Sequence, residues 1–324
     1  LLTKYKKAKV SLPGGCAIGS RPVNLHLFAL KKLGANIKIK DGYIHAKATL
    51  GLKGAKIKFP SVSVGATENA ILAATRARGK TTLTNCAIEP EIIDLITFLK
   101  KVGIKISVEH KKRLIEITGS TEDNFVSHKV ISDRIELGTY IIAAALSGNK
   151  ISFNNVNTKV INTEIKILRK MGVKMKFNKN KITIFKSSKL KNTQIKTEPY
   201  PGFPTDLQAQ IMVLMTQAEG ISKIKESIFE NRFMHVPELR RMGAKIGIKN
   251  NEATIKGPNK LSGAEVMATD LRASVSLVLA GLAAENRTVI NRIYHLDRGY
   301  HNLEKKLIKC KASIKRIKKW NQKT

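Results

Sequence analysis

A phrase of about ten residues recurs along the chain at nearly constant spacing. Its copies are LKKLGANIKI (30–39), LKKVGIKISV (99–108), LRKMGVKMKF (168–177), LRRMGAKIGI (239–248) and a degenerate LIKCKASIKR (307–316). The anchor positions Gly34, Gly103, Gly172, Gly243 and Lys311 are 69, 69, 71 and 68 residues apart. A period of about 70 residues predicts a repeated supersecondary unit.

Each copy of the phrase predicts the end of a helix followed by a strand. Leu and Met recur at helical spacing, and Lys or Arg fall in the last turn, where the helix dipole favours cations. The glycine then takes the left-handed position that ends the helix. Alternating apolar residues such as Ile104, Ile106 and Val108 indicate a half-buried strand after it.

Between these copies lies a second recurring phrase, an apolar helix followed by a turn and a short strand. It covers 68–85, 138–155, 207–224 and 271–292. Together the two phrases predict an α/β fold of βαβαββ repeats. One such repeat cannot bury both its helices and its sheet face, so the repeats must pack against one another.

The number of repeats predicts the domain organisation. The 324 residues correspond to roughly 4.6 repeats, and the first is cut short before its helix phrase. We expect two lobes of three repeats each, divided near residue 131 into 1–131 and 132–324, with about 100 further residues preceding Leu1. The alternative is that the first repeat is degenerate.

The chain is strongly basic, with 59 Lys and Arg against 24 Asp and Glu and a net charge of +35. Of the 59 cations, 45 are Lys, spread along strands and turns, and aromatic residues make up 5%. Nucleic-acid readers favour Arg and interleave aromatic residues for stacking. We therefore attribute the charge to compositional drift and expect no specific nucleic-acid partner. A basic protein that binds anions or nucleic acid remains the weaker alternative.

The three cysteines form no CxxC pair. This argues against a disulfide scaffold, a zinc ribbon and an iron–sulfur centre, and fits a reducing compartment. No apolar run approaches 18 residues, so we expect no transmembrane helix and no membrane association.

Cys16 lies in a glycine-rich loop, PGGCAIGSRP, residues 13–22. Arg21 follows five residues later, and a nearby guanidinium stabilises a thiolate. Such a cysteine can act as acid, base or nucleophile, whereas the alternative is a passive loop residue. We expect Cys86 and Cys310, which lie in strand and helix-end phrases, to be structural.

Asp206 lies in PYPGFPTDLQAQ, residues 199–210, directly before an apolar helix phrase. Two interpretations stay open. Either Thr205 or Asp206 caps the helix that follows, or the Asp206 carboxylate faces a cleft and takes a proton from a substrate hydroxyl.

Arg272 and Arg298 lie in ATDLRAS and YHLDRGY, in a chain that otherwise prefers lysine. The planar guanidinium suits phosphate or carboxylate. The alternative is that each pairs with a neighbour, Asp270 with Arg272 and Asp297 with Arg298. Asp270 is also the predicted N-cap of the helix that follows it.

In SVSVGATENA, residues 61–70, Gly65 and a helix starting near Thr67 would offer backbone N–H groups to an anion. Other patterns fail as motifs. RGKTT at 78–82 lacks the first glycine of a phosphate-binding loop and reads as a helix-to-strand turn. His295 and His301 are six residues apart, the wrong spacing for a metal site on one helix face.

Five long motifs carry a family resemblance. The segments PGGCAIGSRPVNLH, FPTDLQAQ, FENRFMHVPELRRMGA, MATDLRASVSLVLAG and RIYHLDRGY resemble the UDP-N-acetylglucosamine enolpyruvyl transferases, and the similarity runs from about residue 1 to 318. The related shikimate-phosphate transferases share the repeat but lack the cysteine loop. The resemblance implies a two-lobed inside-out α/β barrel.

The resemblance also implies an activity. The enzyme would transfer the enolpyruvyl group of phosphoenolpyruvate to the 3-hydroxyl of UDP-N-acetylglucosamine and release phosphate. This is the first committed step of peptidoglycan synthesis, which supports cell-wall biogenesis, cell shape and division. The family implies a cytoplasmic monomer, inhibition by fosfomycin, and no metal or organic cofactor.

The family's functional residues carry over onto matching positions. Cys16 matches the cysteine that delivers a proton and can carry an adduct, and Asp206 the carboxylate that takes the sugar hydroxyl proton. Arg21 and Arg298 match the groups that hold phosphoenolpyruvate, with Arg272 near the same cluster. The remaining expected contacts are Arg21, Pro22, Val23, Asn24 and Leu25 for uridine, Ser63, Val64 and Gly65 for the diphosphate, and Asp206 and Ile228 for the sugar.

Some positions depart from the family pattern. Asn24 replaces an aspartate in the uridine stretch, and Ser61 replaces a lysine before the diphosphate turn. The family's N-terminal Lys-Asn pair and an active-site arginine would precede Leu1. An inactive truncated remnant is therefore the alternative to a working enzyme, and the degenerate copy at 307–316 favours it.

Overall fold

The computed structural model describes residues 1–13, 22–121, 124–148, 150–187 and 189–317. The chain forms two compact units. Among the described residues, the first unit contains 1–131 with 199–201, and the second contains 132–198 and 202–317.

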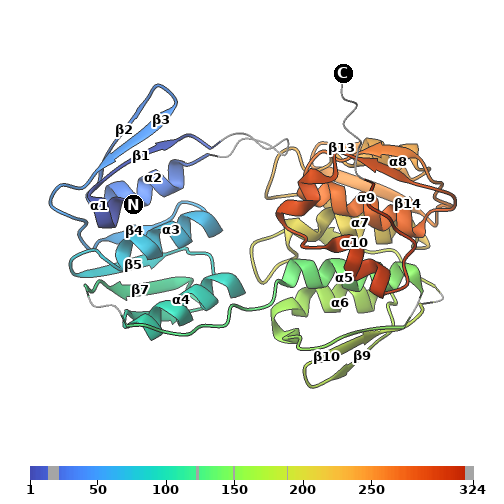
Figure 1. The fold of residues 1–324 in the computed structure, drawn as a ribbon, viewed down its shortest axis with the longest axis horizontal. Helices are drawn as coiled ribbons and strands as arrows, with labels where there is room; N and C mark the ends of the chain where they lie inside the picture. Colours follow the sequence, from blue (N-terminus) through green and yellow to red (C-terminus); the bar gives the residue numbers. More distant parts are fainter. Residues whose placement is uncertain (14–21, 122–123, 149, 188, 318–324) are drawn as a thin grey trace. The chain divides into compact units, whose positions relative to one another are not determined.

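The first unit alternates short strands with helices (Figure 1). Its elements are α1 (Leu2–Tyr5), β1 (Lys7–Ser11), α2 (Asn24–Lys32), β2 (Asn36–Lys40), β3 (Tyr43–Lys47), β4 (Lys56–Lys58), α3 (Val64–Ala74), β5 (Lys80–Thr84), α4 (Pro90–Val102), β6 (Lys105–Glu109) and β7 (Leu114–Thr118).

The second unit continues the pattern with longer central helices. Its elements are α5 (Arg134–Ser147), β8 (Ile151–Phe153), η1 (Thr158–Ile161), α6 (Asn162–Lys170), β9 (Met175–Asn178), β10 (Lys181–Ile184), β11 (Gln194–Lys196), η2 (Thr205–Leu207), α7 (Gln208–Thr216), β12 (Gly220–Lys225), α8 (Val236–Arg241), β13 (Lys245–Lys249), β14 (Glu252–Gly257), β15 (Glu265–Met267), α9 (Leu271–Ala283), β16 (Val289–Asn291), η3 (Ile293–Arg298) and α10 (Leu303–Lys309).

Two segments show the predicted βαβαββ repeat in full. In each, the sheet has the same order, β4-β5-β7-β6 in the first unit and β11-β12-β14-β13 in the second. The first two strands are parallel and the other pairs antiparallel, with Leu83 opposite Ile115 and Ile224 opposite Ala253. The repetition of strand order and pairing confirms that the 70-residue period is structural.

The other sheets are shorter versions of the same arrangement. The orders β1-β3-β2 and β8-β10-β9 match the last three strands of the full repeat, and β15-β16 matches its first, parallel pair. These sheets are the ones that residues within the described ranges form.

The anchor positions of the repeated phrase end helices as predicted. Gly34, Gly103, Gly172 and Gly243 have φ values between 88° and 111°, the left-handed region that glycine adopts without steric cost. Lys311 takes the same region, with φ of 67°, although a side chain there costs about 1–2 kcal/mol. The degenerate copy therefore keeps the turn of the other four.

Helices fill the centre of the second unit. All nine residues of α7 are buried, and α5 and α9 pack against it. Figure 1 shows these three helices between the strand layers. The strands alternate buried and exposed residues, as in β12, so one face of each sheet covers the helices. The first unit has its own core, built mainly from α3, α4 and β4–β7.

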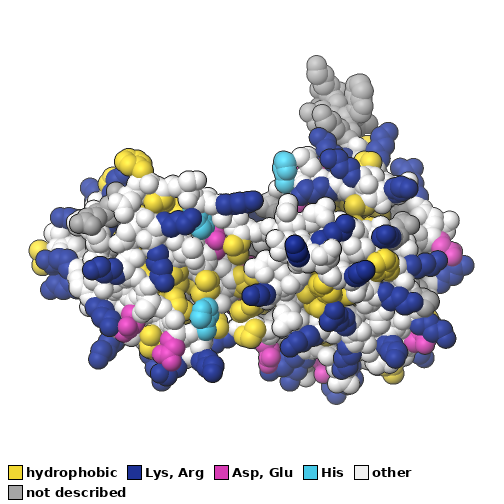
Figure 2. Space-filling model, turned by 90° about the horizontal axis from the view of Figure 1, so that it is seen from below, with side chains coloured by type: hydrophobic (Ala, Val, Ile, Leu, Met, Phe, Trp, Pro, Cys, Tyr) yellow, Lys and Arg dark blue, Asp and Glu magenta, His cyan; other side chains and the backbone are white. Residues whose placement is uncertain are grey.

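Lysine and arginine side chains are dispersed over the visible face of each unit rather than gathered in one stripe (Figure 2). This is the distribution expected if the +35 charge reflects composition. In the described part of the chain, none of the helices has the length and apolar character that a bilayer crossing requires.

Close backbone packing at Gly263 generates the first prediction. A Cβ at this position would lie 2.3 Å from the Arg287 carbonyl oxygen, which is backbone and cannot rotate away. We expect Gly263→Ala to lower the free energy of unfolding by about 1–3 kcal/mol. Gly247→Ala is the matched control, because a Cβ there meets nothing within 4 Å. Urea unfolding of both variants measures the difference, and equal stability would contradict the packing described.

Candidate active site

Asp206 lies between two arginine side chains of the second unit. Its Oδ1 accepts a hydrogen bond from Arg232 Nη2 at 2.7 Å, and its Oδ2 accepts one from Arg272 Nη2 at 2.8 Å. The Arg232 and Arg272 side chains are 5% and 14% exposed, whereas that of Asp206 is 38% exposed. The carboxylate is thus held by two buried cations, and part of it remains accessible to a ligand.

Each of these three residues comes from a different element. Asp206 lies in η2, Arg232 in the loop between β12 and α8, and Arg272 is the second residue of α9. The carboxylate of Asp270 accepts hydrogen bonds from the backbone N–H groups of Arg272 and Ala273, at 2.8 and 3.1 Å. This N-cap fixes the first turn of α9 and with it the origin of the Arg272 side chain.

A buried polar network supports the arginine of α9. Arg272 Nη1 donates to the Tyr300 hydroxyl oxygen at 3.0 Å, and Gln210 Nε2 donates to the same oxygen at 3.3 Å. Thr139 donates its own proton to the Ile135 carbonyl, so the Tyr300 hydroxyl must donate to Thr139 Oγ1, 2.9 Å away. The network joins α5, α7 and α9, the three central helices of the unit.

Electrostatics keep Asp206 ionised. Burial raises the pKa of this carboxyl, but Arg272 and Arg232 outweigh it and hold the pKa below its ordinary value of 3.8. Burial likewise opposes the charge on Arg272, and the contact with Asp206 overcomes it, so the pKa of that guanidinium is raised. Two cations share one carboxylate, which leaves the cluster positive and suited to an anionic substrate.

The loop that carries Ile228 is tied to the segment that carries Asp206. Glu226, 2% exposed, accepts hydrogen bonds from the backbone N–H groups of Ile228 and Phe229, at 2.8 and 3.2 Å. It also accepts one from the Thr205 hydroxyl at 3.0 Å. The Ile228 side chain is 39% exposed, so it is available for contact with a ligand.

The capping interpretation of Asp206 is wrong. A 3₁₀ turn, η2, precedes α7, whose N-cap Leu207 has no side-chain cap. Asp206 does not cap because its carboxylate bonds the two arginines, and the Thr205 hydroxyl bonds Glu226. The predicted N-cap at Asp270 is confirmed.

The alternative interpretation of the late arginines, in which each pairs with its neighbouring aspartate, is also wrong. Arg272 binds Asp206 rather than Asp270. Asp297 binds Arg316, with 2.6 Å between Oδ1 and Nη2, because the chain after α10 returns to η3. Arg298, the last residue of η3, is exposed and has no ion pair among the residues that the structure describes.

The predicted uridine and diphosphate stretches lie at the starts of two packed helices in the first unit. Pro22 and Val23 directly precede α2, which Asn24 begins. Helix α3 starts at Val64 rather than near Thr67, because the Ser63 hydroxyl caps it by accepting the Ala66 N–H at 3.3 Å.

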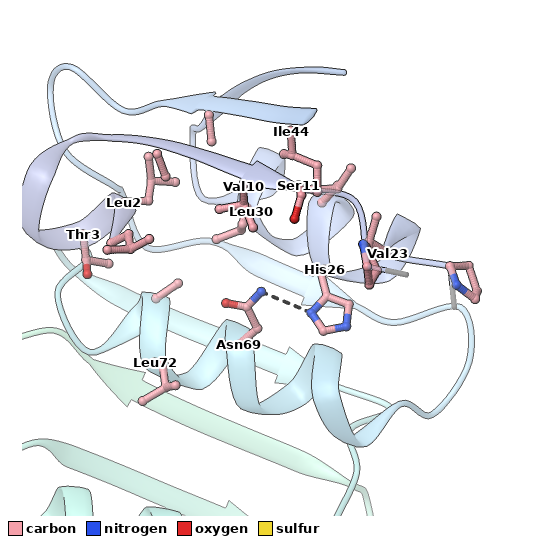
Figure 3. Close-up of a pocket in the computed structure, with 17 residues that line it drawn as sticks. Leu2, Thr3, Val10, Ser11, Val23, His26, Leu30, Ile44, Asn69 and Leu72 are labelled. Atoms are coloured by element: carbon pink, nitrogen blue, oxygen red, sulfur yellow. Dashed lines mark hydrogen bonds between the residues drawn. The ribbon is translucent and has the colours of Figure 1, made fainter. Parts of the chain in front are cut away.

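A side-chain contact connects α2 and α3 (Figure 3). His26 Nδ1 and Asn69 Nδ2 are 3.1 Å apart. Gly65 lies beside the same imidazole, since a Cβ there would be 3.2 Å from His26 Cε1. A groove of about 610 Å³ passes His26 and Asn69 and reaches Pro22 and Val23. The structure thus brings the two stretches to neighbouring helices of one unit.

Cys16 and Arg21 lie outside the described residues. Cys86 follows β5 and is fully buried, and burial raises the pKa of its thiol to about 12 although Arg113 acts in the opposite direction. This fits the structural role expected for Cys86. Cys310 ends α10.

Comparison with known proteins assigns the chain to a family. The profile of EPSP synthase (3-phosphoshikimate 1-carboxyvinyltransferase) matches residues 1–307. The chain is 61% identical over 317 residues to UDP-N-acetylglucosamine 1-carboxyvinyltransferase of Pelagibacter ubique, covering 98% of this chain and 76% of that protein. The chain belongs to the EPSP synthase family of enolpyruvyl transferases.

Other relatives of the enolpyruvyl transferase family agree. The protein of the same name from Rickettsia akari is 53% identical, over 98% of this chain and 75% of its own length. The solved enolpyruvyl transferase NikO from Streptomyces tendae superposes with a TM-score of 0.85 at 25% identity, over 97% of this chain and 75% of that one. EPSP synthase from Acinetobacter baumannii, at 20% identity and a TM-score of 0.65 over 90% and 71%, shares the fold. The expected α/β enolpyruvyl transferase fold is thereby confirmed.

Four residues of the cluster around Asp206 were assigned no role from the sequence alone. Arg232 lay inside the quoted motif FENRFMHVPELRRMGA but received no role. Thr139, Gln210 and Tyr300 were not singled out at all. For Thr139 and Gln210 a signal was available, because a buried apolar helix carries a polar side chain only at a cost unless that side chain is hydrogen-bonded.

A buried histidine beside Arg232 generates the second prediction. His235 is 1% exposed, and burial lowers its pKa from 6.5 to about 4, with Arg232 acting in the same direction and Asp270 against it. Between pH 6.5 and 4 the imidazole binds a proton in the unfolded chain but not in the folded chain. The free energy of unfolding therefore decreases as pH falls through this range.

The expected size of this loss is about 2 kcal/mol between pH 7 and pH 4.5. The folded-state pKa of Asp206 also lies below its ordinary value, so the contribution of this carboxyl to stability is lost in the same direction, but mainly as pH falls through 3.8, below this window. We expect His235→Asn to show a pH dependence of the free energy of unfolding that is weaker by this amount. Urea titrations at both pH values measure it, and identical pH dependences would refute the buried neutral imidazole.

Proposed function

We propose that this chain transfers the enolpyruvyl group of phosphoenolpyruvate to the 3-hydroxyl of UDP-N-acetylglucosamine and releases phosphate. The observation that carries the proposal is Asp206, ionised between Arg232 and Arg272 with part of its carboxylate exposed. The 61% identity to a UDP-N-acetylglucosamine 1-carboxyvinyltransferase supports the choice of acceptor.

In the addition step, the methylene carbon of phosphoenolpyruvate gains a proton and the sugar oxygen bonds to the adjacent carbon. Asp206 accepts a hydrogen bond from the sugar hydroxyl and takes its proton as the new C–O bond forms. The lowered pKa of Asp206 suits a late transfer, because the hydroxyl becomes strongly acidic only when its oxygen bonds to carbon. We assign delivery of the proton to the methylene carbon to Cys16.

In the elimination step, the new methyl group loses a proton and phosphate leaves, which restores the double bond in the product. Cations stabilise the charge on the phosphate and carboxylate of phosphoenolpyruvate. We assign this role to Arg21 and Arg298, with Arg272 close to the same charges. The exposed guanidinium of Arg298 supports its part in the assignment.

We assign the nucleotide to the first unit. Pro22, Val23, Asn24 and Leu25 contact uridine with Arg21, and Ser63, Val64 and Gly65 receive the diphosphate at the N-terminus of α3, where backbone N–H groups favour an anion. Ile228 contacts the sugar with Asp206. In this role the protein acts in peptidoglycan synthesis as a cytoplasmic monomer and is a target of fosfomycin.

The test of this function is product formation by the purified chain. Incubated with phosphoenolpyruvate and UDP-N-acetylglucosamine, the chain should release phosphate and yield the enolpyruvyl ether, identified by its mass. Shikimate 3-phosphate is the control acceptor and should give no product. A folded chain that yields no ether would favour the alternative of an inactive remnant.

The third prediction concerns Asp206. Because Asn cannot take a proton from the hydroxyl, Asp206→Asn should lower the turnover rate by about 10²- to 10⁴-fold. Asp41→Asn makes the same change of charge in an exposed turn of the first unit and should leave turnover unchanged. Phosphate release measures both variants. Equal rates in the two would remove Asp206 from the chemistry.

The fourth prediction concerns thiols. Fosfomycin, an epoxide, and iodoacetamide at pH 8 should alkylate Cys16 before Cys86, because the Cys86 thiol is buried with a pKa of about 12. Peptide mass spectrometry after limited labelling identifies the modified residue, and Cys86→Ala serves as control. Labelling of Cys86 first would overturn the assignment.

A further inference from the structure

The hydroxyl of Tyr300 lies at the centre of the buried network beside Arg272, and the proposed reaction gives it no role. Tyr300 is 1% exposed and lies two residues after η3. Its one proton is donated to Thr139 Oγ1, so both lone pairs of the phenol oxygen are free to accept. Arg272 Nη1 donates to this oxygen at 3.0 Å, and Gln210 Nε2 donates to it at 3.3 Å. The hydroxyl therefore uses its whole hydrogen-bonding capacity.

The guanidinium of Arg272 is held at two separate nitrogens. Nη1 donates to Tyr300, and Nη2 donates to the Asp206 carboxylate at 2.8 Å. A planar group can pivot about one hydrogen bond, whereas bonds on two different nitrogens fix its direction. The Tyr300 ring also lies near this guanidinium, with 5.6 Å between the ring centroid and Cζ, but a phenylalanine would offer the same face. The hydroxyl is thus the part of Tyr300 that aligns the arginine.

Gln210 connects the same network to the backbone of Asp206. Its Nε2 donates to the Asp206 carbonyl oxygen at 2.9 Å and lies 3.1 Å from Thr139 Oγ1. The Gln210 side chain belongs to α7 and is fully buried. The backbone of Asp206 and the side chain of Arg272 are therefore both placed by hydrogen bonds to one buried cluster.

We propose that Tyr300 is a positioning residue whose hydroxyl directs Arg272 toward Asp206, and that Thr139 acts on the site by directing that hydroxyl. Burial raises the pKa of Tyr300, so the phenol keeps the proton that it donates to Thr139. The inference rests on the proposed function only for its effect on turnover, because the alignment of Arg272 stands on the hydrogen bonds.

The experiment removes the hydroxyl alone from the whole chain. Tyr300→Phe keeps the buried ring and its face toward Arg272. The two Nη nitrogens of Arg272 are followed by ¹⁵N NMR and assigned by their loss in Arg272→Lys. Bonds to two partners stop the guanidinium from rotating, so we expect two separate Nη signals in the unaltered chain. In Tyr300→Phe the two signals should merge into one.

Tyr294→Phe is the matched control. The Tyr294 hydroxyl also accepts hydrogen bonds from an arginine, Arg292, at 3.0 and 3.2 Å, but Tyr294 is 56% exposed. This variant should leave both the Arg272 signals and turnover unchanged.

Substitutions of Thr139 keep the test decisive if Tyr300→Phe does not fold. Thr139→Val has a similar shape but cannot accept the Tyr300 proton, so it should move the two Nη signals of Arg272 toward each other. Thr139→Ser keeps the accepting oxygen and should behave as the unaltered chain does. Identical Nη signals in the Val and Ser variants would remove Thr139 from the proposal.

Turnover separates this inference from the function on which it partly rests. Where the chain is active, kcat should fall about 10- to 100-fold in Tyr300→Phe with little change in the KM for UDP-N-acetylglucosamine, because a misdirected group costs rate more than binding. Thr139→Val should lower kcat no further in the Phe background, since the hydroxyl through which it acts is already absent.

The two failures can be told apart. A chain without turnover in which Tyr300→Phe still merges the Arg272 signals would refute the function and keep the inference. Two separate Nη signals in a folded Tyr300→Phe variant would overturn the inference, whatever the turnover.

Discussion

The ion pairs of Asp206 with Arg232 and Arg272 are the interaction on which the second unit's site depends. Burial raises the pKa of this carboxyl, and only the two guanidinium groups reverse that effect. Each guanidinium is itself mostly buried and needs the carboxylate to offset the loss of water around its charge. The three charges therefore stabilise one another, and removing any one leaves the others poorly compensated.

The packing of the repeats brings the charged groups together at the centre of the second unit. In the repeats that contain α7 and α9, an apolar helix follows the first strand. Asp206 lies in η2, directly before α7, and Arg272 lies in the first turn of α9. Because α5, α7 and α9 pack together at the centre of the unit, the helix starts and the buried network of Thr139, Gln210 and Tyr300 converge. The repeat thus builds the fold and also brings the polar groups together.

Features that depend on neighbouring residues could be predicted from the sequence. The glycine ends of helices, exemplified by Gly103, and the N-cap at Asp270 depend on a few adjacent residues, so composition and spacing reveal them. The partner of Asp206 could not be found in this way. Arg232 and Arg272 are 26 and 66 positions away, and any carboxylate could have paired with either.

The interpretations that the structure rules out fail for the same physical reason. One alternative paired Asp297 with its neighbour Arg298, yet Asp297 binds Arg316 because tertiary packing returns that arginine to η3. Thr205 was one of two residues that could have capped α7, yet its hydroxyl bonds Glu226 in another part of the chain. In both cases a short polar side chain had a local partner available and a better placed distant one. The family resemblance, by contrast, singled out Asp206, because a matching position in related proteins already reflects how their distant segments pack.

The balance of burial against two cations at Asp206 is the central physical claim, and one titration tests its sign. The measurement is the pKa of the Asp206 carboxyl in the unaltered, ligand-free chain, followed by ¹³C NMR at low salt while the fold is monitored by circular dichroism. The account predicts a midpoint below 3.8, the ordinary value for an aspartate. A midpoint above 3.8 would mean that burial dominates and that the two arginines do not hold the carboxylate as described.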